Sequence, residues 1–505
     1  MKQQTGVIDI GSNTIRLVIY EHSESRYEEV ENIKIPARLR EYFDDSQSLN
    51  KEGIETIIRA LQLFQTVIQQ YRVPEVICTA TAAIRQAANK KDILQIIKEK
   101  TGFITQLLSD REEAYYGFLG SVHSTYINEG VTIDMGGGST EVTYFRNQEL
   151  IHYHSFPFGS LSLKLNFVKG CLPTEQEKEN IRSFIRSQLT SLSWITDKEL
   201  PIVALGGSAR NIAQIHHNLI DYPLAGIHQY EMSAADVQAV KKSLQPLSYD
   251  DLQKVEGLSK DRTDTILPAL EVFSVLFEVV SATKLVFSSQ GLRDGIIYES
   301  LNRPDQKTDD SADDGIQELL KELHLPMHAK TQEIKLAVSL FKQVREHAEE
   351  VNKRENDLRL LTHGTETFFL GKRINEESSR TAFYLLSNRN IARLSHRDRI
   401  QLALIASYKG KSAFRQYVLP FKNWFSKAEQ KTLCIMGAVI KLAYKLNVSG
   451  KNGVLDIHVS PNKDDWIVYI TCKHPCPAEE YHFLKEKKHL EKLLKVNIVP
   501  KFKLV

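Results

Sequence analysis

The segment GVIDIGSNTIRLVIY, residues 6–20, decides the fold that we expect for this chain. Aliphatic and β-branched residues on both sides of its turn favour two strands, and Gly11 permits backbone conformations that other residues resist. The turn amides and the Ser12 and Thr14 hydroxyls form a surface that attracts anions. Asp9 stands directly before the turn, where its carboxylate can take Mg²⁺ or a metal-bound water. The segment therefore predicts a hairpin that binds phosphate.

A second copy of this pattern, VTIDMGGGSTEVTYF, occupies residues 131–145. It repeats the order of apolar strand, aspartate (Asp134), glycine turn and second strand. Two such hairpins in one chain predict two homologous lobes that hold phosphate in a cleft between them.

Composition and length indicate an ordinary soluble protein: 505 residues, 42% hydrophobic, 25% charged and a formal net charge of +2. A chain of this length predicts three or four domains. The five cysteines are an odd and scattered set, and no signal-peptide pattern opens the chain, so we expect a reducing, cytoplasmic location. The most apolar stretch, residues 266–280, is too short to span a bilayer and predicts a buried helix.

Strands and helices alternate over the first 305 residues, which predicts an α/β fold. In the first lobe, residues 1–125, the expected elements after the hairpin are helices at 52–71, after 89 and at 112–121, with strands at 75–78 and 103–108. In the second lobe, residues 126–305, strands are expected at 150–155, 202–205 and 284–288, and helices from Thr174, after the turn at 206–211, across 266–280 and from Ile296. Thr174 and Glu177 have capping-box spacing.

The rest of the chain reads as a linker and two further domains. Residues 305–315 are polar and lack apolar periodicity, so we place the main linker there. Residues 316–446 have helical spacing throughout and predict an all-α domain. Residues 447–505 predict a small Lys-rich α/β module, with strands at 454–459, 466–472 and 496–499 and a helix at 479–494. From residue 441 onward, twelve lysines stand against seven acidic residues; they form either a solvated face or a surface that attracts a polyanion.

Two segments between the glycine turns offer reactive side chains. Arg85 follows a strand and the small residues of TATAAIR, residues 79–85, and either reaches the cleft as a bidentate phosphate donor or caps a helix at the surface. The segment SDREEA, residues 109–114, begins a helix. One of its two glutamates faces the cleft, or both serve only as partners of the helix dipole.

Six segments in this order resemble the exopolyphosphatase and guanosine pentaphosphate phosphohydrolase family: GVIDIGSN (6–13), ATAAIR (80–85), REEA (111–114), IDMGGGSTE (133–141), GGSAR (206–210) and GLRDG (291–295). That family has two ribonuclease-H-like lobes, the fold of actin, sugar kinases and heat-shock chaperones. The resemblance implies that Glu113 is the general base that activates water, and that Asp134 and Glu141 hold Mg²⁺ or another divalent cation. It implies a phosphate cradle of Gly11, Ser12, Asn13, Arg85, Gly136, Gly137, Gly138, Ser139, Ser208, Arg210 and Arg38.

The chain departs from the family pattern at two places. Downstream of Arg38 the family carries a glycine that this chain lacks. Long members of the family also have a helical domain that resembles metal-dependent His-Asp phosphohydrolases, but near His363 this chain has no adjacent His-Asp pair. We therefore expect no second metal centre in the helical domain, which would serve binding or dimer contact.

The leading hypothesis is a phosphoanhydride hydrolase: a processive exopolyphosphatase with Mg²⁺, present as a homodimer, with neither nucleic acid nor a membrane as a partner. Within the same family the alternative substrate is guanosine pentaphosphate (pppGpp), hydrolysed at its 5′ end. Two other classes stay open. One is a nucleotide-binding kinase or chaperone-like ATPase of the same fold, and the other is a non-catalytic sensor of polyphosphate or alarmone.

Overall fold

The first glycine hairpin lies at the centre of a five-stranded sheet with the order β3-β2-β1-β4-β5. This computed structural model describes residues 3–23, 26–301, 312–323, 331–348, 354–368, 370, 378–462 and 465–505. β1 pairs antiparallel with β2 and parallel with β4. The strands are β1 (Gln3–Ile10), β2 (Thr14–Ser23), β3 (Arg26–Pro36), β4 (Glu75–Ala80) and β5 (Thr105–Leu107). The connecting helices are η1 (Leu39–Tyr42), α1 (Lys51–Tyr71), α2 (Ala82–Arg85), α3 (Lys90–Thr101) and α4 (Asp110–Val122).

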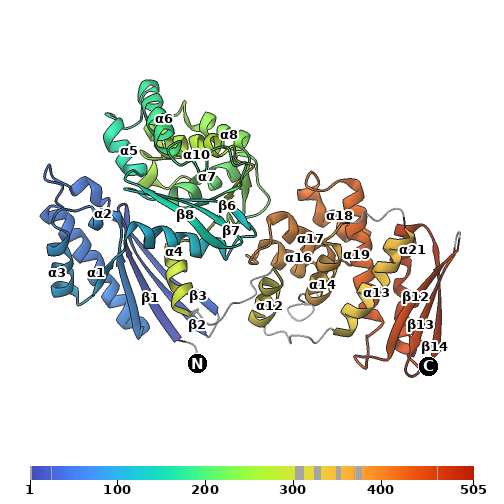
Figure 1. Cartoon of the computed structure of the whole chain (residues 1–505). Helices are drawn as coiled ribbons and strands as arrows, with labels where there is room; N and C mark the ends of the chain where they lie inside the picture. Colours follow the sequence, from blue (N-terminus) through green and yellow to red (C-terminus); the bar gives the residue numbers. More distant parts are fainter. Residues whose placement is uncertain are drawn as a thin grey trace. The chain divides into compact units, whose positions relative to one another are not determined.

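The second hairpin lies in a six-stranded sheet with the order β10-β11-β9-β6-β7-β8. Figure 1 labels β6, β7 and β8 of this sheet. Its strands are β6 (Glu129–Met135), β7 (Thr140–Arg146), β8 (Glu149–Phe156), β9 (Ile202–Leu205), β10 (Glu231–Met232) and β11 (Leu285–Phe287). Its helices are α5 (Ser160–Phe167), α6 (Glu175–Leu189), α7 (Gly206–Leu219), α8 (Ala234–Leu244), α9 (Tyr249–Leu252), η2 (Lys260–Arg262), α10 (Ile266–Val280) and α11 (Leu292–Leu301). In both sheets, an antiparallel meander of three strands continues into two strands parallel to the first, and the second sheet adds β10 at its edge, antiparallel to β11. The two lobes thus repeat one topology.

Local sequence signals explain several of these elements. Thr174 caps α6, and Glu177 completes the expected capping box. α10 occupies the stretch predicted to be a buried helix, and its Glu271 is buried with Lys241 Nζ 2.7 Å from its carboxylate. The helix expected from Ile296 begins earlier, at Leu292. The reason is a contact that closes the first turn: Asp294 Oδ2 accepts a hydrogen bond of 2.8 Å from the Gly291 amide.

Helices α4 and α11 cross where the two lobes meet, and each packs on the sheet of the other lobe. Phe118 of α4 packs with Phe145 and Val203 of the second sheet, whereas Leu292 and Ile296 of α11 pack with strand residues of the first sheet. The helices approach closely because both contact surfaces carry glycine. A Cβ atom on Gly120 would lie 2.2 Å from the carbonyl oxygen of Gly291, and one on Gly295 would lie 2.0 Å from that of Tyr116. The two lobes are therefore joined by packed helices, and together they form one compact unit, residues 1–222 and 227–309.

The second compact unit contains residues 223–226 and 310–505. Its helices are α12 (Ala312–Glu322), α13 (Thr331–His347), α14 (Asp357–Thr367), α16 (Ser378–Asn388), α17 (His396–Ala406), α18 (Lys411–Val418), η3 (Leu419–Phe421), α19 (Lys427–Lys445), α20 (Pro477–Glu486) and α21 (Lys488–Leu494). A three-stranded sheet of β12 (Val454–Pro461), β13 (Asp465–Cys472) and β14 (Asn497–Leu504) completes it. Gln343 of α13 holds the edge of this sheet, since its side-chain amide donates to Ile457 O and accepts from Val459 N.

Three sequence expectations for this unit need comment. Most of the predicted linker, residues 305–311, lies outside the described residues, and its last four residues, 312–315, belong to α12 instead. The single helix expected at 479–494 is two helices that meet at Lys487, whose Nζ reaches Glu491 and the carbonyl oxygen of Ile498. The lysine-rich tail is also partly neutralised, because Lys441 pairs with Glu486 at 2.7 Å and Lys487 with Glu491 at 2.6 Å. Over the described part of the chain, every helix is too short or too polar to traverse a lipid bilayer.

Candidate active site

The two glycine turns have the same internal geometry. In the first, the Gly11 amide donates to the Thr14 carbonyl oxygen at 3.1 Å. In the second, the Gly136 amide donates to the Ser139 carbonyl oxygen at 3.0 Å. Each turn thus closes tightly at its base and presents the residues in between.

The presented residues of the two turns face each other across the lobes. A Cβ atom on Gly137 would lie 3.1 Å from the Cβ of Asn13, and one on Gly138 would lie 2.7 Å from Ser12 Oγ. Within the described residues, nothing accepts a hydrogen bond from the backbone N–H groups of these four residues. Turn amides without an acceptor are the kind of group that binds a phosphate. The two turns pack so closely that a Cβ atom at 137 or 138 would press on the first turn, which accounts for the glycines there.

Glu113 lies on the first turn of α4 with its carboxylate held by Arg85. Arg85 Nη1 donates to Glu113 Oε2 at 2.6 Å and to the carbonyl oxygen of Leu108 at 3.0 Å. The Arg85 side chain is also 2.6 Å from Asp110. Burial raises the pKa of Glu113 to about 7, against the opposing charge of Arg85. A carboxylate with this pKa is suited to accept a proton near neutral pH.

The neighbouring Glu112 has a different role. Its carboxylate accepts hydrogen bonds from the Ser109 amide and hydroxyl at 2.8 and 2.7 Å, and Ser109 Oγ accepts from the Glu112 amide. This is a complete capping box. Of the two glutamates in the REEA segment, one therefore begins the helix and the other belongs to the site.

Three further carboxylates surround Glu113. Asp134 and Glu141 are direct partners across the β6–β7 hairpin, and Asp134 Oδ2 would lie 3.6 Å from a Cβ on Gly117, one turn along α4 from Glu113. Burial raises the pKa of Asp134 to about 6, and burial with the charges of Glu113 and Asp134 raises the pKa of Glu141 well above its usual range. Asp9, at the end of β1, pairs with Arg293 of α11 at 2.7 Å; burial raises its pKa while Arg293 opposes the shift.

The acidic cluster of Asp9, Glu113, Asp134 and Glu141 has the chemistry of a divalent-cation site. Burial is the main cause of the raised pKa values of these carboxylates, and the charge of a divalent cation among them would oppose that shift. Among the described residues, no three His, Cys, Asp or Glu side chains converge on one point as in an all-protein metal cage. Mg²⁺ usually binds through one or two carboxylates and keeps several waters, so this donor set fits Mg²⁺.

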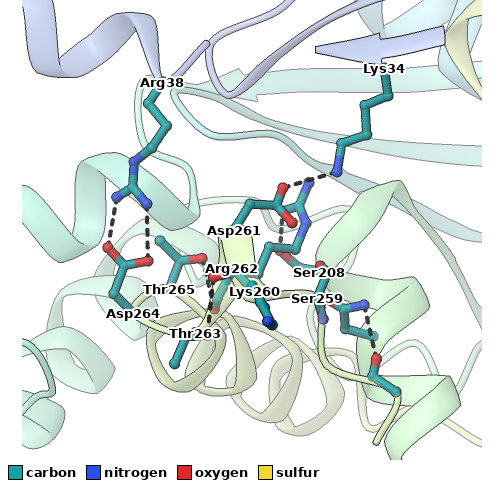
Figure 2. A network of polar contacts seen from close by, with 12 residues as sticks. Lys34, Arg38, Ser208, Ser259, Lys260, Asp261, Arg262, Thr263, Asp264 and Thr265 are labelled. Carbon is teal, nitrogen blue, oxygen red and sulfur yellow. Dashed lines mark hydrogen bonds and ion pairs between the residues drawn. The ribbon is translucent and has the colours of Figure 1, made fainter. Parts of the chain in front are cut away.

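Arg38 bridges the two lobes through an ion pair. Its Nη2 lies 2.6 Å from Asp264 Oδ2 and its Nε 2.6 Å from Glu41 Oε1. Lys34 makes a parallel contact, with Nζ 2.9 Å from Asp261 Oδ2. Figure 2 shows both side chains reaching from the first lobe to the segment around η2. The structure thus places the guanidinium of Arg38, which we predicted to face phosphate, between two carboxylates.

The second-lobe phosphate loop lies at the start of α7. Ser208 is buried, and its hydroxyl accepts a hydrogen bond of 3.2 Å from Arg262 Nη1 (Figure 2). Arg210 is half-buried; burial and the charge of Arg293 lower its pKa. A Cβ on Gly206 would lie 2.9 Å from Asp134 Oδ1, so this loop also contacts the acidic cluster.

Sequence reasoning missed three arginines of this region. Arg293 appeared only as part of the GLRDG motif, and Arg262 gave no signal because nothing local marks it. Arg40 was passed over in favour of Arg38, although its Nε would lie 2.9 Å from a Cβ on Gly138. The signal available near Arg40 was the absence, downstream of Arg38, of the glycine that the family carries.

Comparison with known proteins agrees with this geometry. The model of the Ppx/GppA phosphatase family matches residues 18–304. The chain is 25% identical to exopolyphosphatase 1 of Mycobacterium tuberculosis over 305 residues, 59% of this chain and 88% of that protein. It is 24% identical over 438 residues to the guanosine-5′-triphosphate,3′-diphosphate pyrophosphatase of Pseudoalteromonas translucida, 83% of this chain and 85% of that protein.

Solved structures share the fold of the first unit. The crystal structure of an exopolyphosphatase from Cytophaga hutchinsonii superposes with a TM-score of 0.56 at 22% identity, over 59% of this chain and 98% of that chain. A Ppx/GppA family member from Aquifex aeolicus gives a TM-score of 0.53 at 23% identity, over 61% of this chain and all of that chain. These likenesses show that the chain shares the α/β fold of these Ppx/GppA and exopolyphosphatase structures.

Proposed function

Because the chain belongs to the Ppx/GppA phosphatase family, whose members hydrolyse phosphoanhydride bonds, we propose that it is an exopolyphosphatase acting on inorganic polyphosphate. One observation carries this proposal: Glu113 is held by Arg85 in one cluster with Asp9 and Asp134, the aspartates that precede the two glycine turns. In those turns the amides of Ser12, Asn13, Gly137 and Gly138 have no acceptor among the described residues. The turns would bind the terminal phosphate of the chain. Glu113 would aim a water at its phosphorus.

In the proposed reaction the Glu113 carboxylate takes a proton from water, and the oxygen attacks the terminal phosphorus. The bond to the bridging oxygen breaks, which releases inorganic phosphate and a polyphosphate shorter by one unit. Arg85 orients the Glu113 carboxylate and offers positive charge to the phosphoryl oxygens. The amides of the two turns add hydrogen bonds to those oxygens as their charge changes.

Asp134 and Glu141, with Asp9, are the residues that would hold Mg²⁺. Bound there, the ion would supply positive charge to the phosphate oxygens and to the buried carboxylates. The second-lobe residues Ser208 and Arg210 would extend the phosphate site. Arg38 would keep the two lobes together through Asp264.

A second candidate substrate is pppGpp, which would lose its 5′ terminal phosphate by the same chemistry. The alignment to the Pseudoalteromonas protein favours it, since that match extends over 83% of this chain and reaches beyond the family-model region. The exopolyphosphatase of M. tuberculosis matches only 59% of the chain.

Initial rates with Mg²⁺ on long-chain polyphosphate, tripolyphosphate and pppGpp separate these candidates. We expect the largest kcat/KM on long-chain polyphosphate. A higher value on pppGpp would select the second candidate. Phosphate release from none of the three, by a folded protein, would contradict the assignment as a phosphoanhydride hydrolase and favour a sensor.

A further inference from the structure

Arg40 is fixed beside the first glycine turn by backbone hydrogen bonds. The amides of Ala37 and Arg38 both donate to the Asn13 carbonyl oxygen, at 2.9 and 3.0 Å. The Leu39 amide donates to the Ser12 carbonyl oxygen at 2.8 Å. Arg38 itself adopts the left-handed conformation, with φ of 44°, which turns the chain before η1. The backbone at Arg40 is therefore held in place by the glycine turn that would bind phosphate.

The side chain of Arg40 lies against the second glycine turn. Its Nε would be 2.9 Å from a Cβ on Gly138, and the same Cβ would be 2.7 Å from Ser12 Oγ. The guanidinium stacks over the Phe43 ring, with 4.9 Å from its carbon to the ring centroid. Phe43 thus holds the planar group in place from one face and leaves its edge for polar contacts.

No described residue accepts a hydrogen bond from the buried Nε of Arg40. Burial and the nearby charge of Arg85 lower the pKa of Arg40. A buried donor without an acceptor, on a charged group that faces another arginine, destabilises the folded protein. An anion at this point would satisfy the donor and neutralise the Arg40 guanidinium, whereas Arg85 is already paired with Glu113 and Asp110.

Arg38 provides an internal comparison, because it lies two residues from Arg40 at the start of η1. Its guanidinium is neutralised by Asp264 and Glu41. The two arginines therefore differ in their partners. Arg38 is paired with carboxylates, whereas the Nε of Arg40 has no acceptor among the described residues and lies beside Gly138.

We propose that Arg40 is a phosphate-binding residue of this chain, which donates to the phosphate held between the two glycine turns. The inference rests on the proposed function only in that the ligand is the terminal phosphate of a phosphoanhydride. Arg40 and Arg85 together would give the site two guanidinium groups. This arrangement suits a terminal phosphate, which carries more negative charge than an internal one, and its product, inorganic phosphate.

The test compares Arg40→Met with Arg59→Met. Methionine keeps much of the length of the side chain and its packing on Phe43 but removes the charge and the donors. Arg59 lies exposed on α1, where its guanidinium donates a hydrogen bond to the Thr56 hydroxyl one turn away, so it serves as the matched control. The full-length variants are titrated with inorganic phosphate and with tripolyphosphate by isothermal calorimetry, and their melting temperatures are measured without ligand.

We expect Arg40→Met to weaken the binding of both ligands by about 10- to 100-fold, the loss typical of hydrogen bonds to a charged group. We expect its melting temperature without ligand to stay the same or to rise, because a buried donor without an acceptor is removed. Arg40→Lys, which retains charge but loses Nε, should recover part of the affinity. Arg59→Met should bind both ligands as the natural protein does.

Two results would overturn the inference. One is unchanged affinity for phosphate and tripolyphosphate in Arg40→Met. The other is a lower melting temperature of Arg40→Met together with a change in affinity no larger than that of Arg59→Met. That result would indicate a structural role for Arg40. Failure of the proposed function is distinguishable, because it would appear as no polyphosphate hydrolysis by the natural protein while Arg40→Met still weakens phosphate binding.

Discussion

At the scale of single residues, the adjacent glutamates Glu112 and Glu113 have different roles: the first caps the helix and the second belongs to the candidate active site. Consecutive helical residues point about 100° apart, so both cannot face the same neighbour. Glu112 is used by the Ser109 capping box, and Glu113 meets Arg85 and the acidic cluster. Substitutions at the two positions should therefore have opposite effects on stability and activity.

We predict that Glu113→Gln lowers kcat on long-chain polyphosphate by roughly 10²–10⁴-fold, the usual contribution of a positioned general base. Its melting temperature should change little or rise, since a buried carboxylate becomes a neutral amide. Glu112→Ala is the control: it should cost about 1 kcal/mol of unfolding free energy through the lost cap and keep near-natural turnover. Equal turnover in the Glu113→Gln variant and the natural protein would remove Glu113 from the mechanism.

The raised pKa of Glu113 predicts a pH dependence. Burial, with the charges of Asp9 and Asp134 adding to it and Arg85 opposing it, raises this pKa to about 7. A general base must be ionised, so kcat/KM should rise with pH up to about 7 and level off above it. Initial rates measured at pH values below and above 7, at constant ionic strength, test this rise in kcat/KM. The same rise in Glu113→Gln would assign the titration to another group.

At the scale of elements, the crossing of α4 and α11 decides how the lobes meet. Gly120 and Gly295 allow each helix backbone to touch the other, so each helix can reach the sheet of the opposite lobe. Glu113 is on α4 and Arg293 is on α11. The same crossing therefore carries one acid of the site and the arginine that pairs with Asp9.

We predict that Gly120→Ala destabilises the protein by about 1–3 kcal/mol, the usual cost of overpacking. In an open helix the same change would stabilise by up to about 1 kcal/mol. The sign reverses here because the new Cβ would lie 2.2 Å from the carbonyl oxygen of Gly291, a backbone atom that cannot rotate away. Urea denaturation measures the difference. Gly170→Ala is the control, since its Cβ would meet only the Leu172 carbonyl oxygen at 3.7 Å and should change stability by less than about 0.5 kcal/mol.

At the scale of the whole molecule, the chain consists of two compact units, and each has its own buried residues. The proposed site lies entirely within the first unit. Ligand binding stabilises only the cooperative unit that contains the site, unless the two units unfold together.

We therefore predict two transitions in differential scanning calorimetry of the full chain. Tripolyphosphate should raise the temperature of one transition and leave the other unchanged. Glu112→Ala should lower the same transition that tripolyphosphate raises, because its capping box belongs to the first unit. A single transition that shifts as a whole would show that the units unfold as one.

Some elements could not be found from local pattern. β3 carries five charged residues in its eleven, which reads as an exposed segment, yet it pairs with β2 along its whole length. Strand pairing of this kind depends on an available neighbouring edge, and the sequence of β3 alone does not reveal that edge. The start of α11 is a different case, because the hydrogen bond between Asp294 and the Gly291 amide joins residues only three apart and is a local signal.

The amino-acid sequence by itself determined the two glycine hairpins, the capped starts of helices such as α6, the buried helix α10 and the family of the chain. Each depends on interactions within a few residues, so a local pattern is enough to predict it. Only the tertiary structure decided that α4 and α11 exchange lobes, that Arg38 pairs with Asp264, and that Arg40 lies open beside the glycine turns. These contacts join residues that are far apart in the chain, and their geometry follows from how the two lobes pack against each other.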